Sequence, residues 1–406
     1  NAQGVSMRKK PEDIILIGGG LTAKCLALML SHSGYSYSWL AQKKEAVRRD
    51  KRTTTIHHAG MKMLSALGVW DKMPEPACPI HTIAVAKGGP PNKSGRKDWP
   101  LRWHNDAPAM AYVIRNAVLS DALDAVYRGP APYAADITGF ERTSDVTRLT
   151  DANGAEHHCH LAIACDGSAS TIRSLARLKA VPFSVKQTAL VSLLTTERPL
   201  HQTAYQRFLP GGPLAIMPTT DYEGSLVWSM PDEAAQKLAE AGAEAVSSAL
   251  QNSFGDCLGK MTICDDILLW PLKPAFMPTI TAPGLILAGD AAHALHPLAG
   301  MGFNLALADI AELADCLKTA HSRGLSAGHL SVQQSYAAKR RAEIISLTAV
   351  TQSVNWLFSQ PDGLLSSLSE LGFVGLGALP VKNKLKQIAM GGQLSRPSLF
   401  SGVMPF

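Results

Sequence analysis

The stretch DIILIGGGLTA, residues 13–23, decides the fold. Residues 13–17 form a short, uninterrupted apolar run, which is typical of a strand buried on both faces of a parallel sheet. Glycines follow at once, a helical pattern of apolar residues continues to Gly34, and residues 35–40 are predicted to form a second strand. Strand, Gly-rich turn, helix and strand within about 30 residues make a βαβ unit. The sequence therefore predicts an α/β fold with a Rossmann-like domain.

Two more buried strands are predicted further along the chain, at residues 161–165 and 284–288. Each runs into an acidic residue beside a glycine. From about residue 180 to 270, alternating runs separated by proline and glycine predict antiparallel strands instead. The Rossmann-like domain is therefore expected to be discontinuous, with a β-rich domain inserted. From about residue 332 the pattern is mostly helical, which predicts a C-terminal helical segment.

The composition narrows the class of protein. The chain has 406 residues, 46% hydrophobic and 18% charged, which is enough apolar surface for a large core. The net charge of +6 is scattered and only 6% of residues are aromatic, so a nucleic-acid partner is not expected. Seven cysteines without a CxxC pair favour neither a disulfide framework nor a zinc site, and a cytoplasmic location fits best. Apolar stretches are too short to predict a membrane span.

The motif Gly18-x-Gly20-x-x-Ala23 places small residues where a backbone must approach a pyrophosphate. Amide groups at the following helix N-terminus would face the anion. Alone, this spacing fits an unliganded Gly-rich turn equally well, and the flanking strand and helix favour the binding interpretation. The acidic residue expected at the end of the second strand is missing, because Ala41 and Gln42 stand there.

The block from Gly289 to Asn304 is more specific. Asp290 follows a buried strand, where its carboxylate can accept hydrogen bonds from a ribityl chain. Gly300 and Gly302 open the next helix, so their amide groups can face a flavin ring that becomes negatively charged on reduction.

Three blocks together resemble the class A flavoprotein monooxygenases, which have the p-hydroxybenzoate hydroxylase fold. They are the first Gly-rich turn, the stretch from Asp166-Gly167 through Ser170 to Arg173, and the Gly289-Asp290 block. A fourth block, at residues 205–218 and 225–228, is similar to the ubiquinone-biosynthesis hydroxylases of the UbiH/UbiF type. The resemblance extends from about residue 12 to residue 391.

This resemblance implies an FAD-dependent aromatic-ring monooxygenase. NAD(P)H would reduce the flavin, O₂ would form a flavin C4a-hydroperoxide, and a polyprenylated phenol of ubiquinone biosynthesis would be hydroxylated. Two alternatives stay open. One is a class A monooxygenase for another aromatic substrate, and the other is a flavin-deficient scaffold in a quinone-synthesis assembly, which the departures at Ala41 and Met301 make conceivable.

The resemblance also implies roles for individual residues. Phe208, Pro213, Ala215 and Trp228 would belong to the substrate site, and His296 and Pro297 would lie at the flavin edge, with no acid, base or metal ligand assigned. The residues expected to contact FAD are Gly18, Gly20, Ala23, Arg52, Arg115, Asp166, Gly167, Asp290, Pro297, Gly300, Gly302 and Asn304.

The expected segments follow the same resemblance. The FAD-binding domain would consist of residues 8–75, 111–178 and 273–330, the substrate domain of residues 76–110 and 179–272, and the C-terminal helices and tail of residues 331–406. Association with the inner membrane surface or with a quinone-synthesis complex is an open alternative for an apolar substrate. The tract Glu156 to His160 is expected to be a solvated edge, because adjacent histidines on a strand alternate faces and cannot converge on one metal ion.

Overall fold

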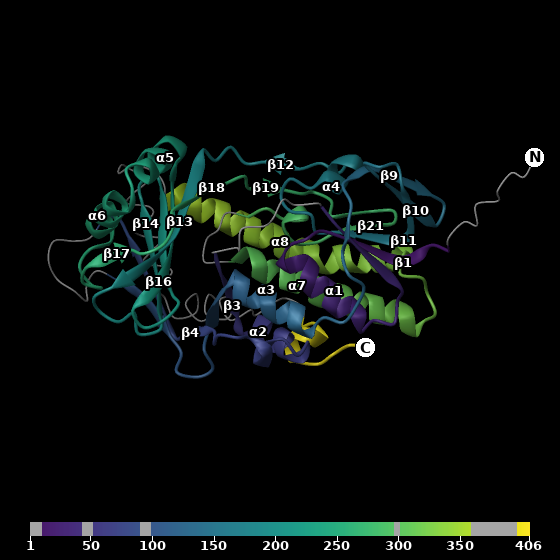
Figure 1. Cartoon of the computed structure of the whole chain (residues 1–406), viewed down its shortest axis with the longest axis horizontal. Helices are drawn as coiled ribbons and strands as arrows, with labels where there is room; N and C mark the ends of the chain where they lie inside the picture. Colours follow the sequence, from purple (N-terminus) through teal and green to yellow (C-terminus); the bar gives the residue numbers. More distant parts are fainter. Residues whose placement is uncertain (1–9, 43–51, 90–98, 296–300, 359–395) are drawn as a thin grey trace, which may run out of the picture.

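A computed structural model describes residues 10–42, 52–89, 99–295, 301–358 and 396–406. Two sheets lie at opposite ends of the molecule, and a long helix, α8 (Leu330–Phe358), runs between them (Figure 1). The mixed α/β architecture, with an inserted β-rich part and a C-terminal helix, confirms the predicted fold class.

The first sheet is the Rossmann-like one. Its central strands are parallel and buried, and Ile14, Ile15 and Leu16 of the first strand are almost fully buried because helices cover both faces. Two further strands extend it as an antiparallel hairpin. In the described residues its order is β20 (Thr281–Ala282), β21 (Leu285–Leu287), β11 (Glu156–Ala164), β1 (Glu12–Ile17), β2 (Tyr37–Ala41), β8 (Tyr133–Ala134), with β10 (Val146–Asp151) and β9 (Ile137–Thr143) joined to β11.

The helices of this part share one core with the sheet. The first helix is apolar on most of its surface, because it is packed between the sheet and two other helices. The elements are α1 (Leu21–Ser31), α2 (His58–Ala66), α3 (Asn116–Val126), α4 (Thr171–Leu175) and α7 (Met301–Ser322), with 3-10 turns η1 (Trp70–Lys72), η3 (Gly289–Ala291) and η5 (Ser398–Ser401).

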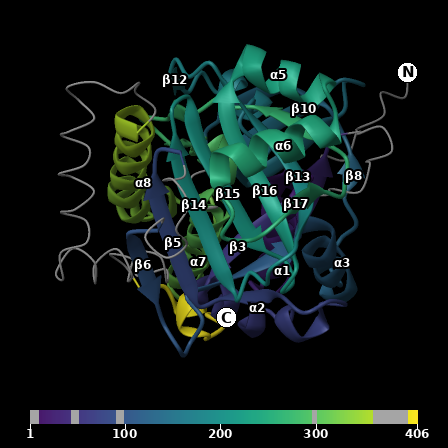
Figure 2. The ribbon, with the colours of Figure 1, turned by 90° about the vertical axis from the view of Figure 1, so that its left-hand side faces the viewer.

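The second sheet is mostly antiparallel, and α5 (Asp232–Glu240) and α6 (Ala243–Phe254) lie across its outer face (Figure 2). Because it contains strands from the two segments expected to form the substrate domain, it is called the substrate sheet below. In the described residues its order is β17 (Met261–Ile263), β13 (Gln187–Thr196), β16 (Glu223–Pro231), β15 (Gly212–Pro218), β14 (Thr203–Leu209), β5 (Thr82–Lys87), β6 (Leu101–His104), with β18 (Leu268–Pro271) paired to β13.

A smaller sheet lies between the two large ones. It consists of β3 (Thr53–His57), β7 (Ala111–Arg115) and β4 (Cys78–Ile80). Its apolar side chains pack with Ala204, Ala215 and Met217 of the substrate sheet, and Thr53 Oγ1 donates to Ser225 Oγ over 2.8 Å. The inner face of the substrate sheet therefore looks toward the Rossmann-like part. The pair β12 (Val181–Pro182) and β19 (Ala275–Phe276) completes the strands described.

One local expectation is confirmed only in part. Glu156 is exposed and the three histidines that follow are partly exposed, but the tract is the first half of β11, and residues 156–159 pair with β10. Cys159 is fully buried, and His157 Nε2 lies 3.2 Å from the buried Asp151 carboxylate. Within the described ranges, no group of three or more His, Cys, Asp or Glu side chains is arranged to bind a metal ion. In the same ranges no helix is long and apolar enough to cross a bilayer.

Candidate functional site

The candidate site lies at one edge of the Rossmann-like sheet. Strands β1, β11 and β21 are mutually parallel, so the residues that follow them gather at a single edge. Those residues are the Gly18–Gly20 turn, Asp166-Gly167 and Gly289-Asp290. The carboxyl edge of a doubly wound sheet is where such folds bind nucleotides.

Two glycines of the first turn, Gly18 and Gly20, have different structural roles. Gly18 has φ +145°, and a Cβ there would lie 2.6 Å from the Cys165 carbonyl oxygen, so it allows β1 and β11 to approach. Gly20 has an ordinary φ of −89°, and a Cβ there would meet nothing within 4 Å. Its absent side chain leaves open space in front of α1.

The N-terminus of α1 is suited to an anion. No side chain caps it, and no acidic residue stands in its first turn. The first amide groups of a helix have no partner within the helix, and the helix dipole adds positive potential there. Ala23 is fully buried under this turn, where its small side chain lets α1 pack closely on the sheet.

The end of β2 faces the same turn. A Cβ on Gly19 would lie 3.7 Å from the Ala41 Cβ, so the Ala41 side chain is directed at the Gly-rich loop. In dinucleotide-binding folds a carboxylate at this strand end accepts hydrogen bonds from ribose hydroxyls.

Restoring that carboxylate is expected to strengthen FAD binding. Ala41→Glu should lower the FAD dissociation constant about tenfold, since a hydrogen bond to a charged group contributes roughly 1.5–3 kcal/mol. The measurement is titration of the FAD-free protein by flavin fluorescence. Ala41→Gln, which has the same shape without the charge, is the matched control and should gain less. An Ala41→Glu protein that binds FAD no better than the unaltered chain would contradict this placement.

The Asp166 turn is tied to the Gly289-Asp290 block. Asp166 Oδ2 accepts from the Ile172 amide over 3.2 Å, while Oδ1 is buried without a hydrogen-bond partner among the described residues. Arg173 donates to the Ala291 carbonyl over 3.0 Å and to the Ser168 carbonyl over 2.7 Å. The two turns are thereby fixed together. Gly167, between them, has φ +91° and open space at its Cβ position.

Asp290 and Arg52 lie close enough to interact. The Asp290 side chain is accessible to solvent, yet the protein around it raises the pKa of its carboxyl, while the charges of His293 and Arg52 oppose this shift. The Arg52 guanidinium also stacks 4.3 Å from the ring centroid of Trp270, which is 53% exposed.

Arg115 and Asn304 already have protein partners. Arg115 forms an ion pair with Glu223 of β16, with an Nη2 to Oε1 distance of 2.7 Å, and so joins the Rossmann-like part to the substrate sheet. The Asn304 side chain accepts from the His57 amide and donates to the Thr55 carbonyl, which fixes the start of α7 against β3. Two residues before it, Gly302 has open space at its Cβ position.

The substrate-sheet residues fall on two faces. Phe208 pairs with Pro213 across β14 and β15, and Ala215 pairs with Val227, so these share the inner face. Trp228 has the opposite orientation and packs with the apolar residues under α5 and α6. Phe208, Pro213 and Ala215 therefore lie on the face toward the Rossmann-like part, and Trp228 does not.

Some of the predicted residues lie outside the described part. These residues are His296, Pro297 and Gly300, and their positions stay predictions. The structure adds three residues that the sequence did not single out, namely Trp270, Asp309 and Arg340. Of these three, only Trp270 could have been noticed from its neighbours in the sequence, because it is an aromatic residue next to a proline.

The comparisons with known proteins agree with this geometry. Residues 12–349 match the FAD binding domain family. The chain belongs to this family and is an FAD-dependent monooxygenase. It is similar to the ubiquinone hydroxylase UbiL of Rhodospirillum rubrum, with 31% identity over 94% of this chain and 89% of that protein.

Two further similarities extend the comparison. The 3-demethoxyubiquinol 3-hydroxylase of Escherichia coli is 27% identical over 83% of this chain and 87% of its own length. Among solved structures, the p-nitrophenol 4-monooxygenase PnpA of Pseudomonas putida DLL-E4 superposes with a TM-score of 0.75 at 16% identity, covering 95% of this chain and 99% of that one. The last similarity supports the fold.

The residues present fit FAD. Open space at Gly20 and Gly302 leaves room for the pyrophosphate and the ring, and the uncapped α1 N-terminus supplies donors for an anion. The buried, unpartnered Asp166 Oδ1 and the accessible Asp290 supply acceptors for hydroxyl groups.

Proposed function

We propose that this monooxygenase hydroxylates the aromatic ring of a polyprenylated phenol in ubiquinone biosynthesis, using NAD(P)H and O₂. The observation that carries the proposal is the inner face of the substrate sheet. Phe208, Pro213 and Ala215 lie on it, and Val191, Val227 and Leu268 continue the apolar surface beside them. The polar residues next to this surface are Gln206, opposite Ala215, and Lys87 of β5, opposite Phe208. The names of the curated relatives support the same substrate class.

Residues of the Rossmann-like part would hold the cofactor. Gly18, Gly20 and the α1 amide groups would bind the FAD pyrophosphate, and Asp290 would accept hydrogen bonds from the ribityl chain. FAD, when bound, supplies the redox chemistry that activates O₂. Gly167, Arg52 and Arg115 would act near it, with Arg115 placed through its ion pair with Glu223.

The substrate sheet would orient the ring and exclude water. The apolar part of the inner face would favour desolvation of a prenyl tail, at about 0.8 kcal/mol for each buried methylene group. The same face would keep water from the reacting atoms, and so would protect the activated oxygen from reaction with water before it is transferred. None of the described residues needs to act as an acid or base in this account, and regiochemistry would follow from how the ring is held.

Substrate-stimulated turnover tests the proposal. A phenol with one or two isoprene units should raise the rate of NADPH oxidation, and the product should carry one oxygen atom from labelled O₂. The unprenylated phenol with the same ring substituents is the control, and its kcat/KM should be lower by about tenfold or more, as burial of a few methylene groups predicts. Equal kcat/KM for the two phenols would favour a small soluble aromatic substrate and refute the prenyl assignment.

A further inference from the structure

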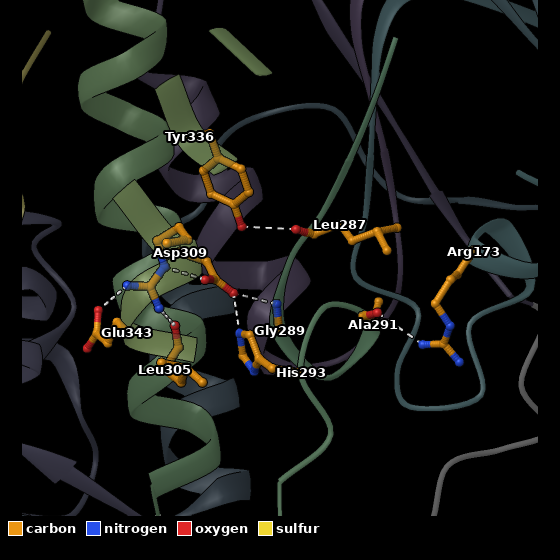
Figure 3. Close-up of polar contacts among 10 residues, drawn as sticks. Arg173, Leu287, Gly289, Ala291, His293, Leu305, Asp309, Tyr336 and Glu343 are labelled. Atoms are coloured by element: carbon orange, nitrogen blue, oxygen red, sulfur yellow. Dashed lines mark hydrogen bonds and ion pairs between the residues drawn. The ribbon is translucent and has the colours of Figure 1, made fainter. Parts of the chain in front are cut away.

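A buried cluster of charged residues contacts the turn that begins at Gly289 (Figure 3). Asp309 of α7 and Arg340 of α8 have no exposed side-chain surface, and His293 is buried with them. Arg340 Nε lies 2.7 Å from Asp309 Oδ1, and His293 Nε2 lies 2.6 Å from Asp309 Oδ2. Charges buried this deeply are costly unless each has partners with good geometry, so the arrangement is tightly specified.

Asp309 holds both ends of the turn. Its Oδ2 accepts from the Gly289 amide over 2.8 Å as well as from His293, so one carboxylate oxygen binds the first and the last residue of 289–293. Gly289 has φ +60° and opens the turn, and Asp290 is the next residue. The direction in which Asp290 points is therefore set by Asp309.

Arg340 in turn holds Asp309. Its guanidinium binds the other carboxylate oxygen, donates to the Leu305 carbonyl over 3.3 Å and pairs with Glu343. Burial would raise the pKa of the Asp309 carboxyl, but the charges of His293 and Arg340 and their hydrogen bonds keep that pKa below its usual value. Asp309 is thus an anion that can accept from the turn.

A second contact from α8 reaches the same region. Tyr336, four residues before Arg340, donates from its hydroxyl to the Leu287 carbonyl over 2.9 Å. Leu287 ends β21, immediately before the turn. Through Tyr336 and Arg340, helix α8 therefore fixes both the strand and the turn that present Asp290 (Figure 3).

We propose that Arg340 is a positioning residue for FAD, acting through Asp309 to fix the turn that carries Asp290. The proposal rests on FAD binding by this family and not on the identity of the substrate. A negative result in the hydroxylation assay would therefore not contradict the role proposed for Arg340. That role is tested by FAD affinity and by the spectrum of the bound flavin, both measured without substrate.

The chain offers a matched control beside this cluster. Lys339, the residue before Arg340, pairs with Glu312 of α7 over 3.0 Å, and Glu312 is as buried as Asp309. This ion pair also joins α7 to α8, but it includes no atom of the turn at 289–293. Lys339→Met should weaken helix packing without moving Asp290.

The experiment compares Arg340→Met, Arg340→Lys and Lys339→Met in the full chain. The urea midpoint of each FAD-free protein is measured on one sample. A second, folded sample is titrated with FAD, and the circular dichroism of the bound flavin is recorded at saturating FAD. Arg340→Met should weaken FAD binding about 30-fold, on the scale of one lost charged contact, and change the flavin dichroism. Arg340→Lys, which can still donate to Asp309 Oδ1, should recover most of both.

The control decides between positioning and stability. Lys339→Met should lower the urea midpoint yet leave FAD affinity within about twofold and the flavin dichroism unchanged. Equal losses of FAD affinity in Lys339→Met and Arg340→Met would overturn the proposal, as would an unchanged flavin dichroism in Arg340→Met. If Arg340→Met does not fold, Asp309→Asn replaces it, because an amide has a single acceptor oxygen and so cannot accept from both Arg340 and the turn. Unchanged FAD affinity and dichroism in that variant would refute the proposal equally.

Discussion

Gly20→Asp is expected to abolish FAD binding while the chain still folds. The backbone at Gly20 has φ −89°, which any residue adopts, and nothing lies within 4 Å of the position of a Cβ. The new carboxylate would occupy the space in front of α1 and repel the pyrophosphate from the amide groups that bind it. We expect affinity to fall by about 100-fold or more, since both space and charge are opposed.

The same substitution should stabilise the FAD-free protein. Asp is a favourable N-cap residue, and Gly20 caps α1 without a side-chain hydrogen bond, so a gain of a few tenths of a kcal/mol in unfolding free energy is expected. Urea unfolding and FAD titration of one preparation measure both effects. Gly20→Asn, an equal cap without charge, is the control and should lose less affinity. Stoichiometric FAD in purified Gly20→Asp would contradict the proposed pyrophosphate site.

Asp290→Ala is expected to yield a protein that loses its flavin during purification. The carboxylate is accessible to solvent and close enough to Arg52 for their charges to interact, so it can accept hydrogen bonds from a ribityl chain. Two charge-assisted bonds at roughly 1.5–3 kcal/mol each correspond to a loss of about 100-fold or more in affinity. The flavin-to-protein ratio by absorbance measures it directly.

Asp290→Asn separates charge from shape. The amide keeps an acceptor of the same size but lacks the charge, so its FAD affinity should fall between that of the unaltered chain and that of Asp290→Ala. The urea midpoint of the FAD-free proteins should differ little, because the side chain is exposed. A yellow Asp290→Ala protein with normal flavin content would show that the ribityl chain is held elsewhere.

Much of the Rossmann-like part was predictable because its signals are local. The apolar run before Gly18 can only be a buried strand when a Gly-rich turn and an apolar helix follow it, and the structure confirms β1, α1 and β2. Asp166 and Asp290 could be placed at one edge because each follows a predicted parallel strand. The tract from Glu156 to His160 was predicted only in part, because the alternation of its histidines does not reveal that β10 pairs with it or that Cys159 is buried.

The inner and outer faces of the substrate sheet were not predictable. Alternation along β15 and β16 separates Ala215 from Trp228, but it does not say which face meets α5 and α6. Arg340 was missed for a related reason. Its partner Glu343 is three residues along the same helix, but Asp309 is recognisable as a partner only once α7 and α8 are packed together. Nothing in the residues from 330 to 345 points to a turn near residue 290.

The most direct measurement is the visible spectrum of the purified protein before and after anaerobic NADPH, and again after readmission of air. The account predicts flavin absorption bands that bleach with NADPH and return with O₂, and a bleaching rate that rises when a prenylated phenol is present. A colourless protein that added FAD does not restore, or a bound flavin that neither NADPH nor NADH reduces, would contradict the account and favour a scaffold within a quinone-synthesis assembly.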